Sequence, residues 1–279
     1  MKKSQREPEF LTGKLDTPML NYSVYYFSAT ERILYSLLLF IGGAAVGLAF
    51  YGGLFKEGGN PTSATRISNI VVMILAGAVS VKVFYKSVNQ HLKEKRAGAL
   101  SDQFRSLLDS INTSLSSGST MNDAFINAPK SLLNQYGEQA YIIKELNEII
   151  AGLHNGLTLE EMISDFAARS DNEDIQNFAN VVENCYRMGG DFKSVVRTTK
   201  DIITDKMTVS AEIATKVSSN KLQHTAMCVI PIILVTMLKT MSSMFAENLA
   251  TPIGVIATTI VVGIITASYF WGKKIINIK

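Results

Sequence analysis

The chain has 279 residues, of which 47% are hydrophobic and only 18% charged, and its mean hydropathy is +0.17. A soluble domain usually carries about 25% charged residues, and the shortfall is concentrated in four apolar stretches, so the composition indicates a membrane protein with a water-soluble part. It excludes an ordinary cytosolic enzyme, a disulfide-rich secreted scaffold and a disordered tail, and the net charge of +3 is too small to indicate a nucleic-acid partner.

Residues 1–32 form an N-terminal segment that precedes the first apolar stretch. The segment has no apolar stretch near Met1, so we expect no cleaved signal peptide. Its aromatic run, from Tyr22 to Phe27, has two interpretations that the sequence leaves open. These residues lie on the membrane surface, or they contact a cytoplasmic partner.

Two membrane spans are predicted next, at residues 33–55 and 67–85, and together they form a transmembrane hairpin over residues 33–85. A helix needs about 20 apolar residues to cross a bilayer, and residues 33–55 contain no charged side chain. Lys82 interrupts the second span, but a lysine near a helix end can extend its ammonium to the headgroups.

The segment 86–224 is long enough, at 139 residues, to form a domain with its own core. It contains one proline, and its apolar residues recur at helical spacing with charged residues on the opposite faces. Three such stripes are Leu100, Phe104, Leu107, Leu108, Ile111 and Leu115; Ile142, Ile143, Leu146, Ile149, Ile150 and Leu153; and Ile175, Phe178, Val181, Val182, Cys185 and Met188.

Two turns in this segment share one pattern, because Gly118–Phe125 and Gly156–Ile163 match at a spacing of 38 residues. In each turn the glycine can end a helix in the left-handed conformation, and Thr120 or Thr158 can cap the next helix. An acidic residue three positions later would complete a capping box in each case. These acidic residues are Asp123 and Glu161.

A third turn, at Gly189 and Gly190, is followed by Asp191 as the expected cap of the last helix. Because neither glycine nor proline occurs before Pro231, we expect this helix to continue into the third membrane span. The segment is therefore predicted to be a bundle of six helices, of which the second and the fourth are short.

A second transmembrane hairpin is predicted over residues 225–272, with spans at 226–245 and 252–272, and the tail 273–279 follows it. Lys239 lies inside the third span and is expected to reach the side of the membrane opposite Lys86. Pro231 removes a backbone donor and is expected to kink the helix. Three methionines of this span are predicted to share one face and to pack against a neighbouring helix. They are Met237, Met241 and Met244.

Lysine and arginine are concentrated before the first span, after the second and after the fourth, whereas the loops 56–66 and 246–251 have few. The positive-inside rule therefore places both termini and the segment 86–224 in the cytoplasm. The sequence predicts an all-α, multi-pass protein of the cytoplasmic (inner) membrane, with four transmembrane helices and a cytoplasmic six-helix bundle domain.

No group of residues has the spacing of a catalytic or ligand-binding site. The three histidines, at positions 91, 154 and 224, are scattered, and no carboxylate or second histidine has metal-ligand spacing to any of them. There is neither a Gly-x-Ser-x-Gly nucleophile turn nor a Gly-x-x-x-x-Gly-Lys-Ser/Thr phosphate loop. We expect no catalytic, cofactor or metal site, and hence no enzyme.

The order of these elements resembles the F-domain family of type II secretion, which comprises the platform proteins of type II secretion, type IV pili and Tad (tight adherence) systems. The resemblance covers about residues 95–272 and rests on Gly118–Phe125, Gly156–Ile163 and Arg187–Phe192 with the two valines that follow. Tyr186 stands where the family often has a glutamate. Because the domain occurs once, the chain is most similar to the Tad-type membrane proteins, which act as a pair.

This resemblance implies a platform that couples a cytoplasmic secretion ATPase to the extraction of pilin-like subunits and to filament assembly, in a complex with itself or a related platform subunit. The acidic side chains offer a surface for the ATPase, or they simply favour helix N-termini. The possible ATPase-contact residues are Glu160, Glu161, Asp165, Arg187, Asp191 and Lys193. The structural turn residues are Gly118, Thr120, Gly156, Thr158, Gly189 and Gly190.

The alternative function is the membrane subunit of an ATP-driven transporter. Four spans are few for that role, and they lack the buried acidic residues of a polar solute path. A signalling receptor or a membrane enzyme is less well supported, because the sequence has no kinase, cyclase or long heptad pattern and no acidic pair in its spans.

Overall fold

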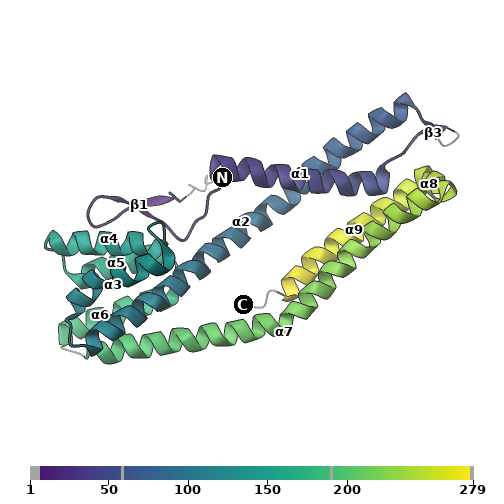
Figure 1. The fold of residues 1–279 in the computed structure, drawn as a ribbon. Helices are drawn as coiled ribbons and strands as arrows, with labels where there is room; N and C mark the ends of the chain where they lie inside the picture. Colours follow the sequence, from purple (N-terminus) through teal and green to yellow (C-terminus); the bar gives the residue numbers. More distant parts are fainter. Residues whose placement is uncertain (1–6, 58–59, 189–190, 277–279) are drawn as a thin grey trace, which may run out of the picture. The chain divides into compact units, whose positions relative to one another are not determined.

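A computed structural model describes residues 7–57, 60–188 and 191–276. The chain is helical, apart from two short hairpins in the described part, and it divides into two compact units. Unit 1 contains residues 1–26 and 89–210, and unit 2 contains residues 27–88 and 211–279. Figure 1 shows the elements of both units in chain order.

Unit 1 begins with the antiparallel hairpin of β1 (Phe10–Thr12) and β2 (Pro18–Leu20). Four helices of 12 to 16 residues form its centre, and consecutive helices among them pack against each other. They are α3 (Met121–Tyr136), α4 (Tyr141–His154), α5 (Leu159–Ser170) and α6 (Glu173–Met188). The unit also includes residues 89–116 of α2 (Ser63–Ser116) and residues 192–210 of α7 (Phe192–Met241).

The predicted apolar stripes form the core of unit 1. Most of their members are buried in one cluster, in which Phe104 packs edge-on against Phe166 and Phe178. Among the stripe residues whose burial is described, Val181 differs from the prediction, because it is 41% exposed. It lies on the side of α6 that borders a groove facing α7.

The two matched turns have related but unequal geometry. Gly118 and Gly156 have φ of +92° and +84°, a conformation that glycine adopts without steric cost. Thr158 accepts a hydrogen bond from the Glu161 backbone N–H, and the Glu161 carboxylate accepts one from the Thr158 backbone N–H, which is a complete capping box.

The expected capping box at Thr120 is only half formed. The hydroxyl oxygen of Thr120 accepts from the Asp123 backbone N–H, but the Asp123 carboxylate accepts from the Thr120 hydroxyl and not from its backbone N–H. An aspartate side chain is one methylene shorter than the glutamate of a capping box, so its carboxylate does not reach the backbone. The third turn, at Gly189 and Gly190, lies outside the described residues.

Among its described residues, unit 2 contains four helices that are long and apolar enough to cross a membrane, as expected of a membrane protein. The first is α1 (Ala29–Tyr51), and the second is the apolar part of α2. The third is residues 222–241 of α7, and the fourth lies in α9 (Pro252–Ile276). A small hairpin of β3 (Lys56–Glu57) and β4 (Asn60–Pro61) connects α1 to α2.

Two predicted span boundaries are wrong. The first helix ends at Tyr51 and not at residue 55, because the next residue, Gly52, has an extended backbone. The third helix ends at Met241, because Ser242 has an extended backbone and accepts the Phe245 N–H to cap a separate helix, α8 (Ser243–Ala250). Met244 therefore belongs to α8 and does not continue the methionine face of the third span.

Small residues let α1 approach α2 closely. A Cβ added to Gly47 would lie 2.5 Å from the Cβ of Ala76, and one added to Gly43 would collide with Ser80. Glycines four residues apart that face small residues are a common packing solution for membrane helices, since apolar side chains gain little by leaving lipid.

The C-terminal end of α1 is bound to each of the other spans by hydrogen bonds. Tyr51 Oη donates to Thr259 Oγ1 at 2.9 Å, and the Gly53 N–H donates to Asn69 Oδ1 at 2.9 Å. Lys239 Nζ donates to the carbonyl oxygens of Ala49, Phe50 and Gly52 at 2.8 to 3.1 Å. The Lys239 ammonium thus satisfies the terminal carbonyl groups of α1, where the helix dipole favours a cation.

Candidate functional site

One end of unit 1 brings together residues of α3, α6 and α7 around Tyr186. The Tyr186 hydroxyl donates to Asn122 Oδ1 at 3.2 Å, and its ring packs 4.8 Å from that of Phe192. A cavity of about 600 Å³ at this place is also lined by Thr120, Asp191 and Lys193. We call this region the Tyr186 surface: Thr120, Asn122, Tyr186, Asp191, Phe192 and Lys193.

The electrostatics of the Tyr186 surface connect it to α5. Burial and the negative charge of Glu160 raise the pKa of Tyr186, so its hydroxyl stays protonated and remains a hydrogen-bond donor. Asp191 Oδ1 accepts the Lys193 backbone N–H at 3.0 Å, the contact expected of a residue that caps α7. Three of the six candidate ATPase-contact residues, Glu160, Asp191 and Lys193, are therefore at or near this surface.

The other three candidate residues are engaged elsewhere. Arg187 forms an exposed ion pair with Glu183 at 2.7 Å. Glu161 belongs to the cap of α5, and its hydrogen bonds from Thr158 lower the pKa of its carboxyl group. Asp165 lies 3.0 Å from the Arg169 guanidinium in a partly buried pair, so it is not a freely exposed acid.

Unit 1 contains a buried polar cluster whose central ion pair, between Glu145 and Arg169, is predicted by no local sequence pattern. Two Arg169 nitrogens donate to the two carboxylate oxygens of Glu145 at 2.7 and 3.0 Å, and the side chains are only 4% and 1% exposed. The Tyr22 hydroxyl donates to the same carboxylate at 3.0 Å. We call Tyr22, Glu145, Asp165 and Arg169 the buried cluster.

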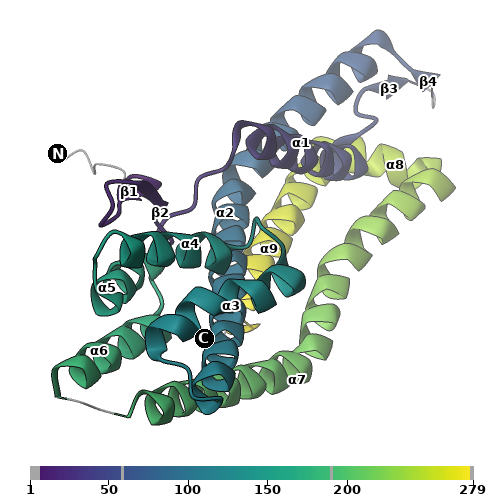
Figure 2. The same cartoon turned by 60° about the vertical axis from the view of Figure 1, so that its left-hand side comes forward.

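The buried cluster fixes the N-terminal segment to the helical unit. The Tyr22 N–H donates to the Arg169 carbonyl oxygen at 3.0 Å, and Arg96 donates to the carbonyl oxygen of Val24. Tyr22 is 3% exposed and belongs to the core. Figure 2 shows the β1–β2 hairpin beside α4 and α5, and Thr17 donates to Glu148 of α4. Part of the aromatic run thus packs within unit 1. This arrangement differs from both interpretations of the sequence, which place the run on the membrane surface or against a cytoplasmic partner.

Tyr22 gives unit 1 a defined response to alkaline pH. Burial and the charge of Glu145 raise the pKa of Tyr22 above its ordinary value of 10.0, whereas in the unfolded chain the phenol titrates near that value. A raised folded-state pKa means that the stabilisation is complete below about pH 10 and is lost as the pH rises further. We therefore predict that the melting temperature of the purified chain falls between pH 9 and pH 11, measured by circular dichroism.

The Tyr22→Phe variant is the matched control for this pH dependence, because it keeps the ring and removes the titrating group. We expect a shallower fall of the melting temperature in this variant. An equal fall in both proteins would assign the effect to other groups, such as the surface lysines.

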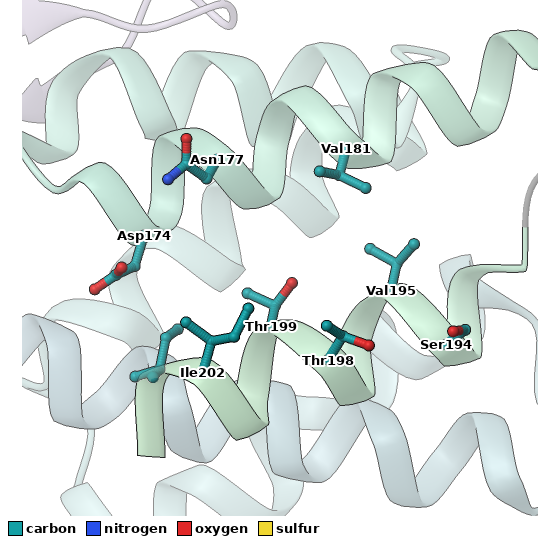
Figure 3. A pocket seen from close by; sticks show the side chains of 9 residues that line it. Asp174, Asn177, Val181, Ser194, Val195, Thr198, Thr199 and Ile202 are labelled. Carbon is teal, nitrogen blue, oxygen red and sulfur yellow. The ribbon is translucent and has the colours of Figure 1, made fainter. Parts of the chain in front are cut away.

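A groove of about 310 Å³ lies between α6 and α7 in unit 1. Figure 3 shows Val181 and Val195 pointing into it from the two helices. Ile202 on its rim is 58% exposed, and a salt bridge between Asp174 and Lys206 closes one end. Most of the exposed lining of the groove is apolar, which suits the binding of an apolar side chain.

Nothing in the described part of the chain forms a group of three or more histidine, cysteine, aspartate or glutamate residues that could hold a metal ion. Cys185 is buried in unit 1 and Cys228 is half-buried in unit 2, and neither forms a disulfide.

Comparison with known proteins identifies no relative of this chain. No protein-family model matches the chain, and no match is found among curated proteins or among solved structures.

Proposed function

We propose that this protein is a non-enzymatic membrane platform of a type IV pilus-like or Tad-type machine. A cytoplasmic secretion ATPase would bind unit 1, and unit 2 would release pilin-like subunits from the bilayer into a growing filament. A second copy or a related subunit would complete the platform. In this proposal both termini and unit 1 lie in the cytoplasm.

The observation that carries the proposal is the continuity of α7. One helix of 50 residues includes Val196 and Ile203, which are buried in the core of unit 1, and continues to the candidate membrane span at residues 222–241. A continuous helix can transmit movement along its axis, because its backbone hydrogen bonds connect each turn to the next. Pro231 removes one of these bonds within the span, and α7 continues through it. Movement of unit 1 by a partner would therefore act directly on a membrane span.

The Tyr186 surface is the part of unit 1 best suited to an ATPase contact. It lies at the start of α7, and it combines an aromatic pair with the exposed charges of Asp191 and Lys193. Aromatic residues supply most of the affinity of protein interfaces, and charges at the rim set the rate and the choice of partner.

The proposal is tested by deleting the gene in the organism that carries it and restoring it with variants. We expect deletion to abolish a surface filament, and the wild-type gene to restore it. Lys193→Glu should reduce assembly, because it reverses a charge on the Tyr186 surface. Lys130→Glu, the same change on an exposed position of α3, is the control and should have no effect. Normal filaments after deletion, with loss of solute uptake, would favour the transporter function.

A further inference from the structure

A cavity of about 810 Å³ lies between the membrane helices of unit 2. This volume is within the range of roughly 300–1,000 Å³ that is typical of ligand sites. Its walls come from all four candidate spans, and none of its lining residues is charged. Most of its lining residues are glycine, alanine, valine or threonine.

The two ends of this cavity differ. At one end Tyr51 and Thr259 are joined by their hydrogen bond, next to the carbonyl groups that Lys239 binds. At the other end the lining residues Phe84 and Tyr269 lie 5.4 Å apart, measured between ring centroids.

The end with Phe84 and Tyr269 carries the features of a membrane–water interface. Further rings surround this pair, because Phe270 stacks on Phe84 and Phe27 packs against Tyr85, and Trp271 is 74% exposed. Aromatic residues of this kind are enriched at the level of the lipid headgroups. The exposed basic side chains near this end are Arg32, Lys82, Lys86 and Lys274, against one acidic residue, Glu31.

These features define what the cavity can hold. Water finds few hydrogen-bond partners in a mostly apolar space, and a space left empty deprives its walls of dispersion contacts. A polar solute would leave its own groups unpaired against uncharged walls. An acyl chain makes apolar contacts with the walls. An anionic headgroup pairs with the positive charges of the lysines at the aromatic end.

We propose that the cavity binds one acyl chain of an anionic phospholipid, whose headgroup lies among the basic residues at the aromatic end of unit 2. The Tyr51–Thr259 end receives the end of the chain. This site depends on the membrane location of unit 2 and not on the role of the protein in filament assembly.

Two glycines provide a matched test. Gly42 lines the cavity, and a Cβ added to it meets no atom within 4 Å, so Gly42→Phe places a ring in open space. Gly263 on α9 also has no atom within 4 Å of an added Cβ, but it does not line the cavity. Gly263→Phe is thus the same substitution in a membrane helix, but its ring does not occupy the cavity.

The measurement is native mass spectrometry of the full chain, purified in mild detergent with added phosphatidylglycerol or phosphatidylcholine. We expect the wild type and Gly263→Phe to retain one phosphatidylglycerol per chain, and Gly42→Phe to retain it about tenfold less. The Lys86→Gln, Lys274→Gln double variant should lose the preference for phosphatidylglycerol. Equal retention by the two glycine variants, no preference in the wild type, or a copurifying protein helix in place of lipid would overturn the proposal.

A second measurement needs no substitution, in case Gly42→Phe does not fold. Cys228 lines the cavity, whereas Cys185 is buried in the core of unit 1. We expect added phosphatidylglycerol to slow alkylation of Cys228 about tenfold in delipidated protein, read from the mass of its peptide, and to leave Cys185 unchanged. Alkylation of Cys228 at the same rate with and without the lipid would contradict the site.

Discussion

Glu145→Gln is expected to destabilise unit 1 by about 3 kcal/mol, because it leaves the buried Arg169 guanidinium without its main counter-charge. Breaking a buried ion pair usually costs about 3–5 kcal/mol. The lower value applies here because Asp165 lies 3.0 Å from Arg169 and retains part of the attraction. Hydrogen exchange of the α4 and α5 amides in the full chain measures this free energy of opening.

The exposed pair of Arg187 and Glu183 supplies the control for this experiment. Glu183→Gln should change the same opening free energy by less than about 1 kcal/mol, since solvent screens an exposed pair. The double variant Glu145→Leu, Arg169→Met should recover part of the loss, because it removes both buried charges together. An effect of Glu145→Gln no larger than that of Glu183→Gln would show that the buried cluster does not stabilise unit 1.

Tyr22→Ala is expected to cost about 3–5 kcal/mol and to release the N-terminal segment from the helical unit. The substitution removes a ring that is packed in the core and edge-on to Tyr141, and it leaves the Glu145 carboxylate with one donor fewer. The amides of β1 and β2 should then exchange much faster than those of α3, which does not contact Tyr22 through any described hydrogen bond or ring pair.

Tyr22→Phe separates packing from hydrogen bonding in the same position. It keeps the ring and removes only the hydroxyl donor, so the expected loss is about 1–3 kcal/mol. Protection of β1 and β2 that is unchanged in Tyr22→Ala would mean that the hairpin is held by its other contacts, such as the hydrogen bond from Thr17 to Glu148.

Local patterns in the sequence predict much of this fold. Long apolar stretches predict the four candidate spans, because a bilayer allows only a segment of that length and composition. The stripes that include Phe104, Leu146 and Phe178 predict the core of unit 1, because a helix places residues three and four apart on one face. The sequence also predicts the Thr158 cap, because its partner Glu161 is only three residues away.

The features that the sequence does not predict depend on residues far apart in the chain. Tyr22 and Glu145 are separated by 123 positions and Glu145 and Arg169 by 24, and no short-range pattern connects them. The sequence predicts that Lys239 extends to the membrane surface, and its contact with carbonyl groups 187 to 190 residues earlier has no local signal. The helix break at Ser242 falls inside the predicted span 226–245, although serine is a favoured N-cap residue.

The measurement that tests the proposed platform function most directly is a pull-down from native membranes in mild detergent, with a tag at the C-terminus and mass spectrometry of the recovered proteins. The platform proposal predicts recovery of a secretion-type ATPase together with a second platform subunit or pilin-like subunits, and weaker recovery of the ATPase with Lys193→Glu than with Lys130→Glu. Recovery of a transporter's nucleotide-binding subunit with a solute-binding protein, and of no secretion ATPase, would contradict it.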